Sequence, residues 1–173
     1  MMGMMHVYTG EGKGKTTAAF GLALRAVGSG NKAVVIQFMK GRKDVGEFKI
    51  QKRLRGLEVH QFGRPDFIDP MAPKKIDFDL AAEGLHFARQ IIARRPKPNL
   101  LILDEANVAM HYGLLSERDV LAFIKKVPKS VELVLTGRYA PKKIIAAADL
   151  VTEMKEIAHP YRKGTKARRG IEF

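Results

Sequence analysis

The stretch YTGEGKGKTT, residues 8–17, decides the fold of this chain. The run from His6 to Thr9 that leads into it predicts a strand, and the Ala-rich residues 16–27 that follow predict a helix ending at Gly28. A strand, a glycine-rich turn and a helix start together form the context of a phosphate-binding loop. Glycines permit the φ angles that turn successive backbone N–H groups toward one anion, and the helix start adds its dipole. The stretch therefore predicts a nucleotide-binding loop of the P-loop type.

The spacing of this loop differs by one residue from the standard pattern G-x-x-x-x-G-K-[ST]. With Gly14-Lys15-Thr16 aligned to the end of the pattern, its first glycine falls on Thr9 instead of Gly10. Lys15 would place an ammonium on the phosphates, and Thr16 would place a hydroxyl on Mg²⁺. The competing interpretation is a glycine-rich turn without a ligand, which the two lysines and two threonines at this strand–helix junction disfavour.

Strand-like and helical segments alternate along the rest of the chain. Apolar, β-branched runs lie at residues 33–38, 57–62, 100–103, 131–135 and 150–154. Helical patterns lie at residues 76–94, after Ser116 and after Pro141. This alternation predicts an α/β fold, a P-loop NTPase-like three-layer sandwich with a mostly parallel, about six-stranded central sheet. We expect a single domain over residues 1–173, with residues 57–62 near an edge of the sheet.

Three segments outside the strands have their own expectations. The long helix should bury a stripe of Leu80, Phe87 and Ile91. The residues 63–75 before it contain three prolines and should form a loop. The residues 157–173 are basic, but they end in the apolar sequence GIEF, so we expect this tail to dock on the domain.

The composition limits the possible chemistry. The chain has no cysteine, which excludes disulfides, a zinc ribbon, a thiolate nucleophile and an iron–sulfur cluster. Lys and Arg outnumber Asp and Glu by 31 to 18, and the net charge of +13 favours anionic partners. The alternative is that the charge serves solubility, especially in a protein from a hot environment, where Lys enrichment is common. No run approaches the roughly 20 apolar residues that span a bilayer, and residues 1–6 are not a signal peptide, so we expect a cytoplasmic protein.

Two further motifs follow strand-like runs. Four apolar residues end in Asp104 and Glu105, which is the Walker B arrangement, in which a buried strand delivers carboxylates beside the phosphate loop. Acids often follow strands, so the signal depends on its pairing with that loop. Thr136-Gly137-Arg138 follows the next strand, and a guanidinium there would match phosphate oxygens bidentately. The alternative is that Arg138 is a solvated loop residue.

These motifs, taken together, resemble the P-loop type of ATP:corrinoid adenosyltransferase, the cob(I)yrinic acid a,c-diamide adenosyltransferases. The resemblance runs from about residue 6 to the end and rests on the segments 8–21, 25–28, 37–41, 103–105, 135–138, 148–153 and 159–173. It implies an enzyme of adenosylcobalamin biosynthesis or salvage. Co(I) of a reduced corrinoid would attack C5′ of ATP, held in reverse orientation across the loop, and inorganic triphosphate would leave. The loop and a metal would then have to gather all three phosphates.

The resemblance also implies roles for individual residues. Lys15, Thr16, Glu105 and Arg138 would be the catalytic residues. Thr16 and Glu105 would ligate Mg²⁺, or Mn²⁺, and Asp104 would orient that metal site from behind. Glu11, at the mouth of the loop, would meet the ribose. ATP would be bound by the whole loop, namely Gly10, Glu11, Gly12, Lys13, Gly14, Lys15, Thr16 and Thr17.

The corrinoid and the partners are also inferred from the resemblance. Members of this family use apolar or aromatic groups to remove the lower axial ligand of cobalt, and Phe67 is our candidate for that role, although it would serve equally as a loop anchor. Some members close over the nucleotide with an N-terminal extension; here the basic tail or a partner subunit would have to do so, unless no closure exists. The family implies a homodimer. The positive charge would suit an acidic flavoprotein reductant, and we expect no membrane contact.

Three other functions fit the nucleotide-binding core. A nucleic-acid-stimulated P-loop ATPase is favoured by the charge, but the chain lacks the interleaved aromatic and basic residues that stack bases, so nucleic acid is an improbable partner. A deoxynucleoside-type kinase would need the cysteines of a zinc ribbon. A nucleotide-gated binding module would leave ATP unchanged in the presence of reduced corrinoid. Release of triphosphate, as opposed to ADP and phosphate, separates adenosyl transfer from these functions.

Overall fold

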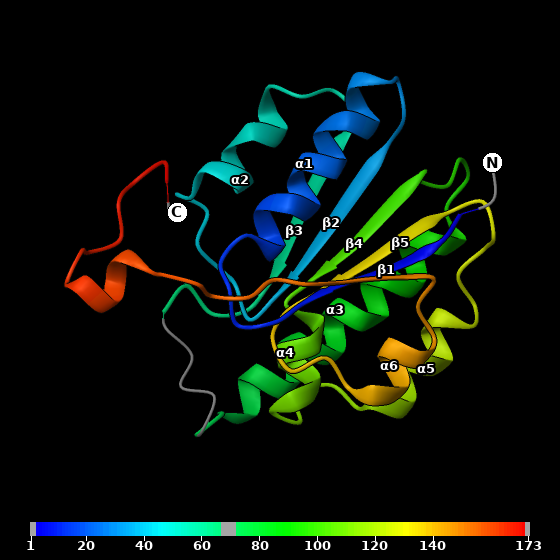
Figure 1. Ribbon diagram of the computed structural model, residues 1–173. Coiled ribbons are helices and arrows are strands. Elements are labelled where there is room, and N and C mark those ends of the chain that lie inside the picture. Colours follow the sequence, from blue (N-terminus) through cyan, green and yellow to red (C-terminus); the bar gives the residue numbers. More distant parts are fainter. Residues whose placement is uncertain (1–2, 67–71, 172–173) are drawn as a thin grey trace.

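The computed structural model describes residues 3–66 and 72–171, which form an α/β sandwich of three layers (Figure 1). Six parallel strands make the middle layer in the order β3-β2-β4-β5-β1-β6, which confirms the predicted parallel sheet. β3 lies at one edge, as its alternating sequence predicted. The strands are β1 (Met5–Thr9), β2 (Ala33–Phe38), β3 (Leu57–Phe62), β4 (Leu100–Asp104), β5 (Glu132–Thr136) and β6 (Leu150–Glu153).

Helices cover both faces of this sheet. α1 and the short α2 lie on one face, and α3 to α6 lie on the other (Figure 1). Short 3₁₀ turns, η1 (Ile50–Lys52) and η2 (Pro160–Lys163), follow α2 and β6. The helices are α1 (Lys15–Gly28), α2 (Gly46–Lys49), α3 (Lys75–Ala93), α4 (Ala106–His111), α5 (Glu117–Ile124) and α6 (Lys142–Ala146).

Alternate residues of the central strands pack into two separate hydrophobic cores, one on each face of the sheet. In β4, Leu101 and Leu103 face the core under α3 to α6, whereas Leu100 and Ile102 face the core under α1. Both sets are at most 2% exposed. The continuous apolar run of this strand therefore follows from its position, because a central parallel strand has no solvent face.

α3 packs differently from the stripe expected for it. Of the three predicted residues only Ile91 is fully buried, and the contact face consists mainly of the small residues Ala81, Gly84 and Ala88, together with Leu85. The reason is the close approach of the helix to the sheet. A Cβ atom added at Gly84 would lie 2.8 Å from the ring of Phe38, so a larger side chain has no room there.

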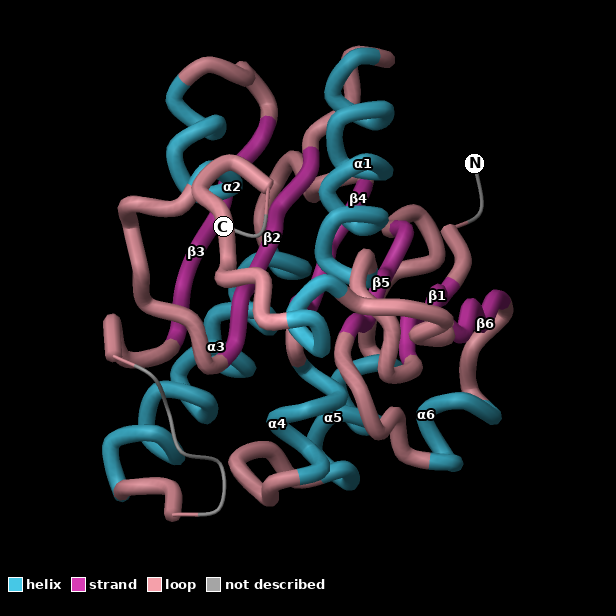
Figure 2. Tube along the Cα trace, turned by 60° about the vertical axis from the view of Figure 1, so that its left-hand side comes forward, coloured by secondary structure: helices cyan, strands magenta, loops and turns pink. Residues whose placement is uncertain are grey.

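The topology brings the carboxyl ends of all six strands to one edge of the sheet. The loops after β1, β2, β4 and β5 emerge there, and in open parallel sheets this edge is where ligands bind. The segment after β6 passes along the same edge, and its last described residues lie near α2 in two views (Figures 1 and 2). Sequence motifs that are far apart along the chain therefore meet at one place.

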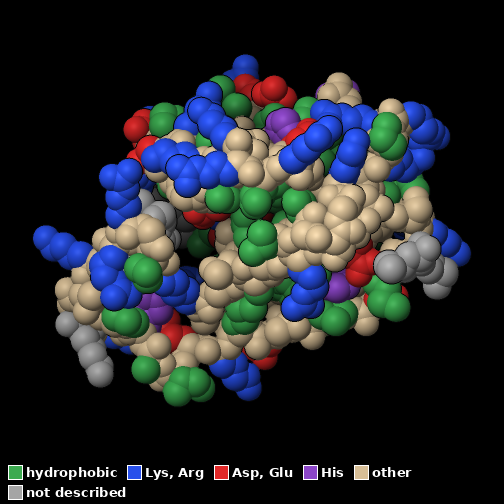
Figure 3. Space-filling view, turned by 90° about the horizontal axis from the view of Figure 1, so that it is seen from above, with side chains coloured by type: hydrophobic (Ala, Val, Ile, Leu, Met, Phe, Trp, Pro, Cys, Tyr) green, Lys and Arg blue, Asp and Glu red, His purple; other side chains and the backbone are tan. Residues whose placement is uncertain are grey.

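Figure 3 shows Lys and Arg side chains across the face seen from above, among hydrophobic and other residues. Within the described ranges, none of the helices has the length and apolar character needed to cross a membrane.

Candidate functional site

The loop between β1 and α1 takes its shape partly from the segment after β6. The N–H of Gly12 donates to the carbonyl of Met154 at 2.7 Å, and the N–H of Met154 donates to the carbonyl of Thr9 at 2.9 Å. Gly10 and Gly14 have φ angles of 93° and 120°, which residues other than glycine rarely adopt. A Cβ atom at Gly12 would lie 2.8 Å from backbone atoms of the facing segment. The glycines thus serve this contact as well as the turn itself.

This contact uses one amide of the loop. The N–H of Gly12 is taken by the carbonyl of Met154. The first N–H groups of a helix lack partners within it, so the amides near the start of α1, which begins at Lys15, are available to an anion. The predicted role of the whole loop in binding ATP stays a prediction.

Lys15 lies inside the loop and is only 8% exposed. Its ammonium donates to the carbonyl oxygens of Gly10 at 2.7 Å and Gly12 at 2.6 Å. An ammonium has three N–H donors, so one donor is left for a ligand. Burial lowers the pKa of Lys15, and the charge of Arg138 lowers it further, while Glu105 and Glu11 act in the opposite direction. An anion at this place would restore the preference for the charged form.

Asp104, at the end of β4, is the centre of a buried hydrogen-bond network. Its carboxylate is fully buried and accepts four hydrogen bonds of 2.7 to 2.9 Å, from Thr16, Gln37, Lys40 and Thr136. Burial alone would raise the pKa of Asp104, but the charge and hydrogen bond of Lys40 and the bonds from Thr136 and Gln37 outweigh it and the pKa is lowered. Asp104 is therefore a carboxylate that ties α1, β2 and β5 together at one point.

Glu105 follows Asp104 but points elsewhere. Its φ of 61° is left-handed and turns the chain sharply from β4 into α4. Its N–H donates to the hydroxyl of Thr136 at 3.0 Å, so the same hydroxyl that binds Asp104 also fixes this turn. Burial and the neighbouring charge of Asp104 raise the pKa of Glu105, against the effect of Lys40, Lys15 and Arg138. The pKa values of these two adjacent acids are thus shifted in opposite directions.

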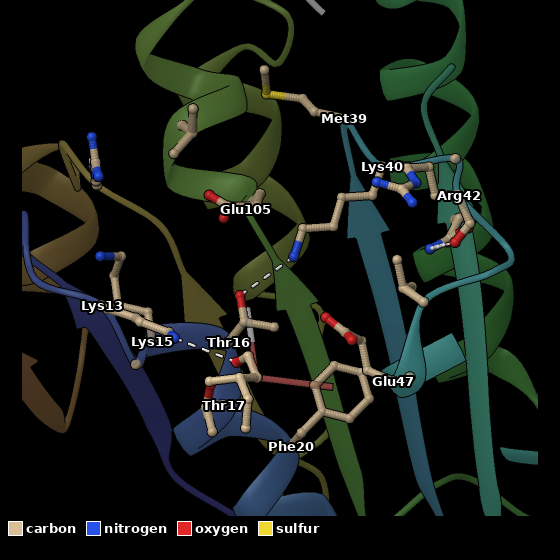
Figure 4. A pocket seen from close by; sticks show the side chains of 18 of the residues that line it. Lys13, Lys15, Thr16, Thr17, Phe20, Met39, Lys40, Arg42, Glu47 and Glu105 are labelled. Carbon is tan, nitrogen blue, oxygen red and sulfur yellow. Dashed lines mark hydrogen bonds between the residues drawn. The ribbon is translucent and has the colours of Figure 1, made fainter. Parts of the chain in front are cut away.

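Lys40 reaches the site from the loop after β2 (Figure 4). Its ammonium lies 2.8 Å from Oδ2 of Asp104 and 3.4 Å from the hydroxyl of Thr16. Burial acts to lower the pKa of Lys40, but the charges of Asp104 and Glu105 outweigh it and the pKa is raised. In the sequence, Lys40 is part of the segment 37–41 but has no predicted role; its position just after a buried strand is the signal that could have identified it.

Arg138 and Glu11 stand at the mouth of the site. Their side chains form an ion pair of 3.4 Å, and each is about half exposed. Arg138 precedes Tyr139, whose φ of 60° is again left-handed. The ring of Tyr139 lies 4.2 Å from that of His111. The ion pair of Arg138 with Glu11 is thus open to solvent.

An open cleft of about 1440 Å³ connects these residues. Its volume exceeds the roughly 300–1,000 Å³ typical of a single-ligand pocket, so it has room for a second molecule beside a nucleotide. One part of the cleft is cationic and is formed by Lys13, Lys15, Lys40 and Arg138. Another part is apolar and is formed by Phe20, Leu24, Ile50 and Leu54.

Most of the predicted site residues lie on this cleft. The exceptions are Gly10 and Asp104, which lie behind its wall, and Phe67, which falls outside the described residues. The end of the predicted docking tail lies here too, because Gly170 and Ile171 line the cleft and the ammonium of Lys13 donates to the carbonyl of Ile171 at 3.4 Å. The polar residues Gln37 and Thr136, which complete the network around Asp104, were not predicted.

The residues at the loop suit a magnesium ion that arrives with a nucleotide. The hydroxyl of Thr16 and the carboxylates of Asp104 and Glu105 are the hard oxygen ligands that Mg²⁺ prefers. Along residues 3–66 and 72–171, no group of three or more His, Cys, Asp or Glu side chains could hold a metal by itself. Mg²⁺ commonly takes only one or two protein ligands and completes its shell with phosphates and water. The donor set therefore fits an ion that is shared with the phosphates of a nucleotide.

Comparison with known proteins identifies the family. The model of the family ATP:corrinoid adenosyltransferase BtuR/CobO/CobP matches residues 1–173. The corrinoid adenosyltransferase of Pseudomonas aeruginosa is 38% identical over 172 residues, which cover 99% of this chain and 84% of the relative. That of a Sinorhizobium species is 37% identical over 174 residues, which cover 99% and 80%, respectively.

A solved structure supports the fold alone. The flagellar accessory protein FlaH from Methanocaldococcus jannaschii superimposes with a TM-score of 0.51 at 15% identity, over 88% of this chain and 71% of FlaH. The family match covers the phosphate loop, the acids after β4 and the segment that lines the cleft from the far end of the chain. The chain therefore belongs to the family of ATP:corrinoid adenosyltransferases, enzymes that transfer the adenosyl group of ATP to a corrinoid.

Proposed function

We propose that this chain carries out its family's reaction by gripping the entire triphosphate of ATP as a leaving group. The observation that carries the proposal is the set of four cationic side chains, Lys13, Lys15, Lys40 and Arg138, on one cleft beside a helix start. A departing triphosphate carries its negative charge over all three phosphate groups, so several cations along one cleft would stabilise it. The arrangement thus favours cleavage of the C5′–O bond over hydrolysis at the γ-phosphate.

The reaction divides the work between substrate and protein. The lone pair of Co(I) in the corrinoid forms the bond to C5′, and the C5′–O bond breaks with its electron pair on the triphosphate. The nucleophile belongs to the corrinoid, so the protein's task is to position C5′ and to stabilise the leaving anion. That anion departs without needing a proton, because the amides of residues 13–17 and the ammonium of Lys15 would bind its charge.

We further propose that Mg²⁺ or Mn²⁺ enters with ATP and is held by Thr16, with Asp104 and Glu105 behind or beside it. The bound ion would neutralise part of the triphosphate charge. The hydrogen bond of 2.8 Å between Thr16 and Asp104 supports this assignment, because it orients the hydroxyl oxygen. Arg138 would leave its exposed pair with Glu11 to contact the triphosphate, and Glu11 would then be free to meet the ribose.

The corrinoid would lie in the part of the cleft that the nucleotide leaves open. The apolar residues Phe20 and Leu24 of α1 and Ile50 of η1 offer a wall for a large ring system with apolar faces. The role of Phe67 in removing the lower axial ligand remains a prediction. We propose that the tail closes over the nucleotide, which its contact with Lys13 supports.

The decisive experiment mixes the protein with ATP, Mg²⁺ and chemically reduced cobalamin. The expected result is the absorption spectrum of adenosylcobalamin, together with inorganic triphosphate in equal amount. ADP and phosphate as products would instead favour the ATPase alternative. Unchanged ATP would favour the binding module. A matched assay without corrinoid measures background hydrolysis and separates the two enzymatic outcomes.

The proposed partners are a second copy of the chain and an acidic flavoprotein. The edge strand β6 exposes Leu150 and Val151 at 41% and 42%, which suits contact with a second copy in a homodimer. Sedimentation equilibrium should then give twice the chain mass of 19.3 kDa. The net charge of +13 suits an acidic, reduced flavoprotein, and the rate of corrinoid reduction should then fall with ionic strength. A cytoplasmic location remains a prediction.

A further inference from the structure

The most informative unassigned residue is Lys40, which lies where cations and phosphates are expected to meet. Its ammonium contacts two oxygens at once, Oδ2 of Asp104 at 2.8 Å and Oγ1 of Thr16 at 3.4 Å. Figure 4 shows the side chain extended across the cleft toward Thr16. These two residues form the oxygen pair proposed above for Mg²⁺. Lys40 therefore places a positive charge against the oxygens that a divalent ion would use.

The position of Lys40 is built into the backbone. Met39, just before it, has a φ of 59°, which turns the chain sharply out of β2. The next residue, Gly41, touches the backbone of the loop after β3, because a Cβ atom there would lie 2.2 Å from the carbonyl oxygen of Gly63. From the other side, a Cβ atom at Gly63 would lie 2.4 Å from the nitrogen of Lys40. Two loops packed backbone to backbone thus hold the lysine at its inward position.

The electrostatics of Asp104 explain why a cation is held there. The carboxylate of Asp104 is fully buried, and among its four hydrogen-bond donors only Lys40 carries a charge. A buried carboxylate without a counter-ion is strongly destabilising. A divalent ion at the same oxygens would be repelled by an ammonium in direct contact with them. The lysine and the metal therefore compete for one place.

We propose that Lys40 is a positioning residue that acts as a tethered, exchangeable cation. It neutralises Asp104 and orients Thr16 before the nucleotide binds, and it prevents a divalent ion from occupying the site alone. When the ion enters together with the triphosphate, the four-carbon stem of Lys40 lets its ammonium swing from the carboxylate to the phosphate oxygens. The metal then arrives only as its nucleotide complex. The inference rests on the proposed metal role of Thr16 and Asp104.

The test measures metal binding directly, without turnover. Mn²⁺ is titrated into nucleotide-free protein and followed by electron paramagnetic resonance, for the wild type and for Lys40→Met and Lys40→Gln. Gln keeps a hydrogen-bond donor for Asp104 without the charge, so it separates electrostatics from packing and serves if the Met variant fails to fold. Lys43→Met, which removes the same charge from an exposed position in the same loop, is the matched control.

The expected result is a crossover. Without ATP, both Lys40 variants bind Mn²⁺ at least about tenfold more tightly than the wild type and Lys43→Met, because the competing charge is gone. With ATP present, both variants bind the Mn²⁺–ATP complex about tenfold more weakly, because the triphosphate loses a cation. Equal Mn²⁺ affinity without ATP, or undiminished affinity for the complex, overturns the proposal. Formation of adenosylcobalamin by the wild type would still uphold the proposed function in either case.

Discussion

Replacing Thr136 by Val removes one hydroxyl group that makes two buried hydrogen bonds at the centre of the site. The hydroxyl donates to Asp104 at 2.7 Å and accepts from the N–H of Glu105 at 3.0 Å. A hydrogen bond to a charged group contributes about 1.5–3 kcal/mol, and a buried donor left without a partner costs about 1–3 kcal/mol. Since one group makes both bonds, the two terms overlap, and we expect a loss of about 3 kcal/mol in the free energy of unfolding.

The matched control is Thr136→Ser, which keeps the hydroxyl and removes only a buried methyl group. That change should cost about 1 kcal/mol. Equilibrium unfolding in urea measures both variants, and an unchanged denaturant dependence would show that the unfolded state is unaffected. If the Val variant proves as stable as the Ser variant, the hydroxyl does not fix the two acids, and the account of the network around Asp104 is wrong.

Three further changes test other parts of the structure. Lys15→Ala should lower kcat by about 100-fold or more while the circular dichroism spectrum stays native, and a rate like that of the wild type would remove Lys15 from the mechanism. The buried carboxylate of Asp77 forms an ion pair with Arg64 at 2.7 Å, and the hydrogen bond from Arg64 lowers the pKa of Asp77. Asp77→Asn breaks this ion pair and should destabilise the protein by about 3 kcal/mol at neutral pH. Because the pKa of Asp77 is lowered in the folded state, the stability that its carboxylate contributes is fully present above the unfolded-state pKa of about 3.9 and is lost as the pH falls through the folded-state pKa. The difference in free energy of unfolding between wild type and variant, measured in urea, should therefore shrink in acid. A difference that does not change with pH would contradict this account. Gly12→Ala should lower the free energy of unfolding by about 1–3 kcal/mol in the same assay, since its Cβ would lie 2.8 Å from facing backbone atoms. The control Gly21→Ala, on the open face of α1, should raise that free energy by up to about 1 kcal/mol. Equal effects of the two changes would show that the backbone does not approach Gly12 closely.

Local sequence patterns were sufficient for the sheet and the phosphate loop. The strand β4 was predictable because its four consecutive apolar residues before Asp104 are typical of a central parallel strand, which is buried on both faces. The buried face of α3 was not, because it depends on how closely the helix approaches Phe38, which is a property of the packed pair. Hydrophobic periodicity predicts burial of large residues such as Leu80, whereas the residue that α3 buries against the sheet is Gly84.

The chemistry of the site was predictable only where a motif stands in one piece. Lys15 and Thr16 follow directly from the loop, and Asp104 follows from the end of its strand. Lys40 reaches the carboxylate of Asp104 from the loop after another strand, and no local sequence pattern predicts that these two residues are in contact. The hydrogen bond from the amide of Gly12 to Met154 was not predictable either, because the segment after β6 lies far along the chain.

The position of β1 between β5 and β6 has a consequence for how the protein is made. The glycine-rich turn is synthesised well before Met154, yet its shape depends on a hydrogen bond to the carbonyl of that residue. Domains generally fold as units during synthesis, so this turn stays unfinished until β6 has left the ribosome. Premature termination before residue 150 should therefore yield a product that cannot hold nucleotide, however complete the rest of its sheet.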